Sequence, residues 1–87
     1  MRIMKLTDTI EMMNSNDFKE RFRAEFHQLK IRRDGLQNML VKYKNDELPF
    51  TPNCSYELLH KQLVFMDCYI NILIERARVE DIDLEVK

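Results

Sequence analysis

Three polar side chains at seven-residue spacing are the residues of this chain best suited to chemistry. Gln62, Tyr69 and Arg76 interrupt an apolar stretch and fall on one line of a helix. A guanidinium can bind a phosphate, and a phenol ring can stack on a flat base. Left unpaired in an apolar interface, such groups cost roughly 1–3 kcal/mol each, and the charge costs more. The line therefore predicts either a polar network that sets the register of an interface or a ligand groove at a subunit junction.

The helix that positions these residues is expected over about residues 55–79, capped by Ser55 or Asn53. One apolar line of this helix is formed by Leu59, Met66 and Leu73 and widened by Leu63, Ile70 and Ala77. A second line, on the other side of the polar one, is formed by Leu58, Phe65, Ile72 and Val79. Together they span roughly 200°, against about 100° for an ordinary surface helix. We expect the first line to pack inside the protomer and the second to be the oligomer interface.

A partner helix is expected over about residues 16–45, capped by Ser15 or Asn16. Its apolar face contains Phe18, Phe22, Phe26, Leu29, Leu36, Leu40 and Tyr43. The segment from Asp17 to Asn45 is basic, with eight Lys and Arg against four Asp and Glu. Arg21 and Arg32 lie near one edge of the apolar face. They are either ligand-binding residues at an interface or solvated side chains whose stems cover the core.

The two helices are expected to form an antiparallel hairpin. Pro49 and Pro52 end the first helix and favour an extended connection over residues 46–54. Leu48 and Phe50 are expected to tuck under the hairpin. Helices of this length joined by a short connection typically pack against each other in antiparallel fashion.

Both ends of the chain are harder to interpret. Residues 1–14 are predicted to be either a weakly ordered N-terminal extension or a short helix. Residues 80–87 form an acidic C-terminal arm whose alternation of acidic and apolar residues is more typical of a strand or a docked arm than of a helix. Without a sheet to join, this arm is expected either to be disordered or to pair with another chain.

Composition favours a small all-α domain that gains buried surface by forming a helical homo-oligomer. The chain has 87 residues, 45% hydrophobic and 33% charged, with one Gly and two Pro. The net charge of −1 does not favour nucleic-acid binding, and no apolar run is long enough for a membrane span. Cys54 and Cys68 are expected to be reduced thiols in the cytoplasm.

Motifs for catalysis or metal binding are missing from the sequence. The two histidines, His27 and His60, lack the short ligand spacings of a zinc site with the cysteines. There is no nucleophile elbow and no glycine-rich phosphate loop. We therefore expect a protein that is not an enzyme and uses neither a metal nor a cofactor.

Two helical patterns and the connection carry a resemblance to phage proteins. The patterns are Phe18-Lys19-Glu20-Arg21-x-x-x-Glu25-x-x-x-Leu29 and Leu59-x-x-Gln62-x-x-x-Met66-x-x-Tyr69-x-x-x-Leu73-x-x-Arg76, with Leu48-x-Phe50-Thr51-Pro52-x-Cys54 between them. Over about residues 17–84 the chain resembles a family of small phage and prophage helical proteins described as related to a protein of crAss-like phages. Its second helix is similar to the anti-Thoeris and anti-CBASS sponge family.

The resemblance to the sponges implies a phage counter-defence protein in the cytoplasm of an infected or lysogenic bacterium. Such a homo-oligomer would sequester a cyclic nucleotide immune signal without cleaving it, and Gln62, Tyr69 and Arg76 belong to the shared pattern. One alternative is a small inhibitor or adaptor that docks on a host or phage protein through its exposed apolar helix face. A structural phage component is a further alternative.

Overall fold

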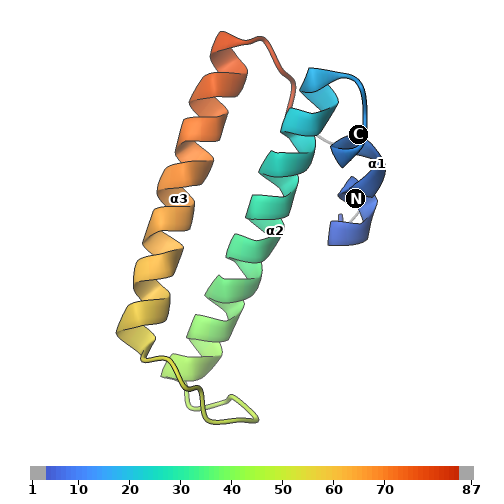
Figure 1. Ribbon diagram of the computed structural model, residues 1–87. Coiled ribbons are helices and arrows are strands. Elements are labelled where there is room, and N and C mark those ends of the chain that lie inside the picture. Colours follow the sequence, from blue (N-terminus) through green and yellow to red (C-terminus); the bar gives the residue numbers. More distant parts are fainter. Residues whose placement is uncertain (1–3, 85–87) are drawn as a thin grey trace.

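The computed structural model describes residues 4–84, and its main feature is a hairpin of two long antiparallel helices (Figure 1). The elements are a 3-10 turn η1 (Leu6–Thr9) and the helices α1 (Ile10–Met13), α2 (Phe18–Lys44) and α3 (Tyr56–Val79). No strand occurs in this part of the chain, so the all-α prediction is confirmed. η1 and α1 pack on α2 on the side away from α3 (Figure 1).

The core between α2 and α3 is built from the apolar lines expected to pack inside the protomer. Its buried residues near the open end of the hairpin are Phe22, Phe26, Leu73, Ala77 and Ile82. Leu40 and Leu63 are buried closer to the connection. The 3.6-residue period of α2 and α3 places the buried side chains of the two helices on facing sides, and Ile82 joins them from beyond the end of α3.

Both long helices begin with a side-chain cap. The Asp17 carboxylate accepts a hydrogen bond from the backbone N–H of Lys19 at 3.0 Å, and the Ser55 hydroxyl accepts one from Leu58 at 3.1 Å. The expected cap of α2, Ser15 or Asn16, is therefore wrong. Ser15 instead accepts a hydrogen bond from the N–H of Asp17 at 3.0 Å and so stabilises the turn before the helix.

The connection is anchored to α2 by Tyr43, whose hydroxyl donates to the carbonyl of Cys54 at 3.2 Å. Leu48 is half-buried as expected, but Phe50 is exposed. The backbone bends at Pro49 and Phe50. An extended strand would place residues 48 and 50 on the same side, and the bend removes this relation.

The described part of the C-terminal arm docks on its own chain, which corrects the expectation of disorder or pairing with another chain. Asp81 adopts the left-handed conformation with φ 56°, and the N–H of Ile82 donates to the carbonyl of Ala77 at 2.8 Å. This is a Schellman ending, and it turns Ile82 into the core. Lys19 and Arg23 of α2 then hold the carbonyls of Asp81 and Asp83 at 3.2 and 2.6 Å.

The N-terminal segment adopts the short-helix alternative over Leu6–Met13. Thr9 is fully buried against α2, and its hydroxyl accepts a hydrogen bond from the amide of Gln28 at 2.9 Å. Predictions that concern residues 1–3 and 85–87 lie outside the described residues.

Candidate functional site

Tyr69 lies at the edge of α3 that contacts α2, here called the seam, which carries Tyr69 and Arg76. Its hydroxyl donates a hydrogen bond to the Glu25 carboxylate of α2, and 44% of the residue remains exposed. This hydrogen bond, followed by burial and the negative charge of Glu25, raises the pKa of Tyr69, whereas the charge of Arg76 acts in the opposite direction. The phenol is therefore neutral at physiological pH, and its position is fixed while part of its surface stays accessible.

Arg76 lies one heptad further along the same seam and is held by contacts on two sides. Its guanidinium carbon is 4.9 Å from the centroid of the Phe22 ring, a cation–π geometry. Its Nη2 atom is 3.7 Å from a carboxylate oxygen of Glu80, in an ion pair that is about half exposed. An exposed pair of this kind contributes only about 0–1 kcal/mol, so the positive charge stays available to a stronger anion.

A shallow hollow of about 410 Å³ borders Arg76 at the end of α3. Its lining also includes Glu75, Val79 and Glu80. The two carboxylates oppose the binding of an anion within one protomer. A phosphate would have to compete with Glu80 for the Arg76 guanidinium.

The five predicted ligand-binding residues do not converge within one protomer. Tyr69 and Arg76 share the seam, and Gln62 is exposed further along α3. Arg21 donates to the carbonyl of Ser15 at 2.8 Å, and Arg32 borders a separate hollow beside α1. Eleven residues of helix place Arg21 and Arg32 about 16 Å apart along α2. A common site for all five therefore stays a prediction that needs more than one subunit.

The predicted oligomer interface is a continuous exposed apolar line along α3. Leu58, Phe65, Ile72 and Val79 are 56%, 64%, 59% and 76% exposed. Each polar residue of the seam follows a member of this line by four positions, so the two lines are neighbours on the helix surface. Large apolar side chains in a contiguous row are typical of a binding surface.

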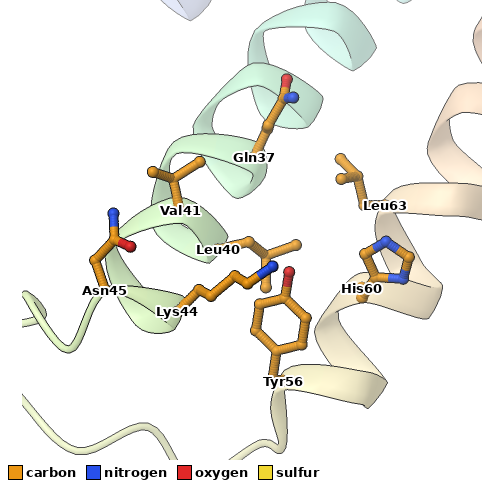
Figure 2. Close-up of a pocket in the computed structure, with 8 residues that line it drawn as sticks. All are labelled: Gln37, Leu40, Val41, Lys44, Asn45, Tyr56, His60 and Leu63. Atoms are coloured by element: carbon orange, nitrogen blue, oxygen red, sulfur yellow. The ribbon is translucent and has the colours of Figure 1, made fainter.

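Sequence reasoning missed a second feature, a groove of about 310 Å³ at the connection end of the hairpin (Figure 2). The end of α2 contributes Gln37, Leu40 and Lys44, and the start of α3 contributes Tyr56, His60 and Leu63. Neither helix shows a motif at these positions. The signal that could have found the groove is the placement of Lys44 and Tyr56 on either side of the connection, because a hairpin brings these two ends together.

A cross-helix ion pair lies between the groove and the seam. Nε of Arg33 donates to the Asp67 carboxylate at 2.6 Å, and the guanidinium also reaches Asp34 at 3.2 Å. These two carboxylates raise the pKa of Arg33. The pair links the middle of α2 to the middle of α3, and Nη1 of Arg33 also donates to the amide oxygen of Gln37.

Within residues 4–84, no group of three or more His, Cys, Asp and Glu is arranged to hold a metal ion. Cys54 and Cys68 are free, exposed thiols. No helix in the described range combines the length and the apolar character that crossing a bilayer requires.

The family model described as Sequestin matches residues 16–79. The chain belongs to the Sequestin family. The matched range includes α2, the connection and α3, which are the elements that carry the seam, the groove and the exposed apolar line. Neither a curated protein nor a solved structure matches this Sequestin-family chain. The family name agrees with the sponge-like function expected from the sequence, while the link to crAss-like phages stays a prediction.

Proposed function

We propose that this Sequestin-family protein sequesters a cyclic nucleotide signal of bacterial immunity without cleaving it, as a phage-encoded counter-defence protein in the host cytoplasm. The observation that carries the proposal is the family match over residues 16–79. The family name points to sequestration, and the resemblance of the α3 pattern to anti-Thoeris and anti-CBASS sponges supplies the class of ligand. The protein acts as a binder and not as an enzyme.

The seam on α3 supports a binding mode for such a ligand. The Arg76 guanidinium is only weakly neutralised by Glu80 and can bind a phosphate, and the exposed part of the Tyr69 ring can stack on a base. The Phe22 ring packs against the Arg76 guanidinium and orders it, so the Arg76 side chain loses little conformational entropy when a ligand binds. A cyclic nucleotide presents phosphates and bases together, which suits this pair.

Assembly through the exposed apolar line completes the proposed mechanism. If Leu58, Phe65, Ile72 and Val79 pack against a second copy, the neighbouring seams of two protomers border the same interface. Arg21 and Arg32 from another subunit can then contribute to the charge around the ligand. Each bound molecule lowers the free signal concentration stoichiometrically, which keeps the signal below the threshold of its effector.

The test compares two neighbouring arginines of α3 in a thermal-shift experiment. The panel contains cyclic dinucleotides, cyclic trinucleotides and cyclic ADP-ribose isomers. A ligand at about 100 times its Kd adds roughly 2.7 kcal/mol of stability per site, which gives a clear rise in Tm for a domain of this size. Arg76→Ala should abolish the rise while leaving the oligomer intact.

Arg78→Ala is the matched control, because Arg78 is exposed and pairs only with Glu75 among the described residues. It should keep the full rise in Tm. An unchanged ligand affinity in Arg76→Ala would contradict the proposed binding mode, and the absence of any rise across the panel would contradict the proposed ligand class.

A second candidate function is favoured by the same exposed apolar line. A small inhibitor or adaptor would use Leu58, Phe65, Ile72 and Val79 to dock on a host or phage protein. The mass of the protein in solution distinguishes the two candidate functions. A docking protein keeps this line exposed and is a monomer, whereas the proposed sponge is a homo-oligomer.

A further inference from the structure

The groove at the connection end of the hairpin combines an apolar floor with an aromatic wall (Figure 2). Leu40 of α2 and Leu63 of α3 are buried beneath it. The rings of Tyr56 and His60 are stacked, with their centroids 6.0 Å apart and their planes 14° apart. The Tyr43 ring meets Tyr56 edge-on at 5.7 Å, so the wall is supported from the connection side as well.

The rim of the groove offers hydrogen-bond donors without an opposing carboxylate. The Lys44 ammonium makes no hydrogen bond or ion pair within residues 4–84, and no Asp or Glu is among the residues that line the groove. Gln37 accepts a hydrogen bond from Arg33 through its amide oxygen, and Arg33 is itself fixed by Asp67 at 2.6 Å. The Gln37 amide is thereby oriented with its NH₂ group left as a donor.

We propose that this groove binds a planar aromatic ring that carries one anionic group, a ligand of the size of a nucleoside monophosphate. The ring packs over Leu40 and Leu63 against the wall formed by Tyr56. The anion binds the Lys44 ammonium and the Gln37 amide. A volume of about 310 Å³ is at the lower end of the range for ligand sites, roughly 300–1,000 Å³, and suits one ring and one anion.

This site is distinct from the seam of the proposed function. His60 precedes Tyr69 by nine positions and therefore lies about 180° around α3 from the seam. All groove residues come from one protomer, so the site does not depend on assembly. Binding here can succeed or fail independently of cyclic nucleotide sequestration.

The experiment is an NMR titration of the full chain with AMP, with adenosine and inorganic phosphate as separate probes. AMP should shift the backbone amides around Tyr56 and the ring signals of His60. Adenosine and phosphate should each bind at least about tenfold more weakly than AMP. Adenosine lacks the anion that contacts Lys44, and phosphate lacks the ring that contacts Tyr56. Equal binding of AMP and adenosine, or shifts confined to residues outside the groove, would overturn the proposal.

Two variants and one control test the rim. Lys44→Ala should weaken AMP binding about tenfold, as expected for the loss of one charge-assisted hydrogen bond. Gln37→Glu keeps the contact with Arg33 but places a carboxylate beside the anion, and it should abolish binding. Lys61→Ala removes an exposed lysine that does not line the groove and should change the affinity less than twofold. Equal losses in Lys44→Ala and Lys61→Ala would contradict the site.

Discussion

At the scale of single residues, Arg76 contributes to the packing of the hairpin and is also the proposed phosphate-binding residue. Its planar head covers Phe22 at 4.9 Å, which contributes to the packing of α3 on α2. Its partner Glu80 is 3.7 Å away and half exposed, so this ion pair is easily exchanged. Tyr69 is held in a similar way by Glu25. Both residues are thus positioned before any ligand binds.

His27 gives a second prediction at the residue scale, one that concerns pH. It is buried where the C-terminal arm meets α2, and its Nε2 atom has no hydrogen-bond partner within residues 4–84. Burial lowers the pKa of His27, the charges of Lys30 and Arg23 lower it further, and a hydrogen bond to the backbone of Leu84 acts in the opposite direction. The unfolded chain therefore binds a proton more readily than the folded one.

The free energy of unfolding should be highest above the ordinary histidine pKa of about 6.5 and should fall as the pH decreases below it. Urea midpoints at pH 7.5 and 5.5 measure this change. His27→Gln should flatten the pH dependence, whereas His60→Gln, at an exposed position, should keep it. A decline of the same size in His27→Gln would contradict the assignment to His27.

At the scale of elements, α2 carries an internal weakness at Gly35. This glycine lies in the middle of a 27-residue helix, and a Cβ added there would have no atom within 4 Å. Its φ is not positive, so it is not required by the backbone conformation. Glycine costs about 1 kcal/mol relative to alanine in the interior of a helix.

Gly35→Ala should therefore raise the free energy of unfolding by about 1 kcal/mol, and Gly35→Val should raise it less because valine is the poorer helix former. Urea denaturation measures both. A loss of stability in Gly35→Ala would contradict this prediction. It would mean that the open space at Gly35 is occupied by a second subunit in close contact with α2.

The exposed apolar line of α3 gives the second prediction at the element scale. Phe65 belongs to this line and is 64% exposed, whereas its neighbour Val64 is exposed on another side of the helix. If the proposed homo-oligomer forms through this line, Phe65→Glu should convert it to a monomer, because a buried unpaired carboxylate is costly in an apolar interface. Val64→Glu should leave the oligomer unchanged.

Light scattering coupled to size-exclusion chromatography measures the mass of each variant, and circular dichroism checks that the helices remain. A monomeric wild-type protein, or dissociation by Val64→Glu and not by Phe65→Glu, would contradict the placement of the interface on this line.

At the scale of the whole molecule, the sequence was sufficient for the all-α fold and for the inner side of the hairpin. The period of apolar residues placed Leu63, Leu73 and Ala77 in the core, where they are found. It also separated them from the line of Phe65 and Ile72, which is exposed in one protomer. Helical periodicity is a local property, and it determines which side of a helix is buried.

Features that depend on long-range contacts could not be obtained in this way. The arm docks because the Schellman turn at Asp81 sends Ile82 into the core, and Lys19 and Arg23 bind backbone carbonyls that have no sequence signature. The exposure of Phe50 depends on a bend at the prolines. The groove with Lys44 and Tyr56 exists only once both helix ends meet.

The most direct test of the central proposal is to recover the signal molecule after it has been bound. Protein and each cyclic nucleotide of the panel are mixed at equal concentrations, the free ligand is measured after ultrafiltration, and the bound fraction is released by heat and identified by mass spectrometry. We predict that one ligand disappears from the filtrate in proportion to the protein and returns intact and complete after denaturation. A ligand that returns cleaved, or a filtrate that loses none of the panel, would contradict sequestration of a cyclic nucleotide.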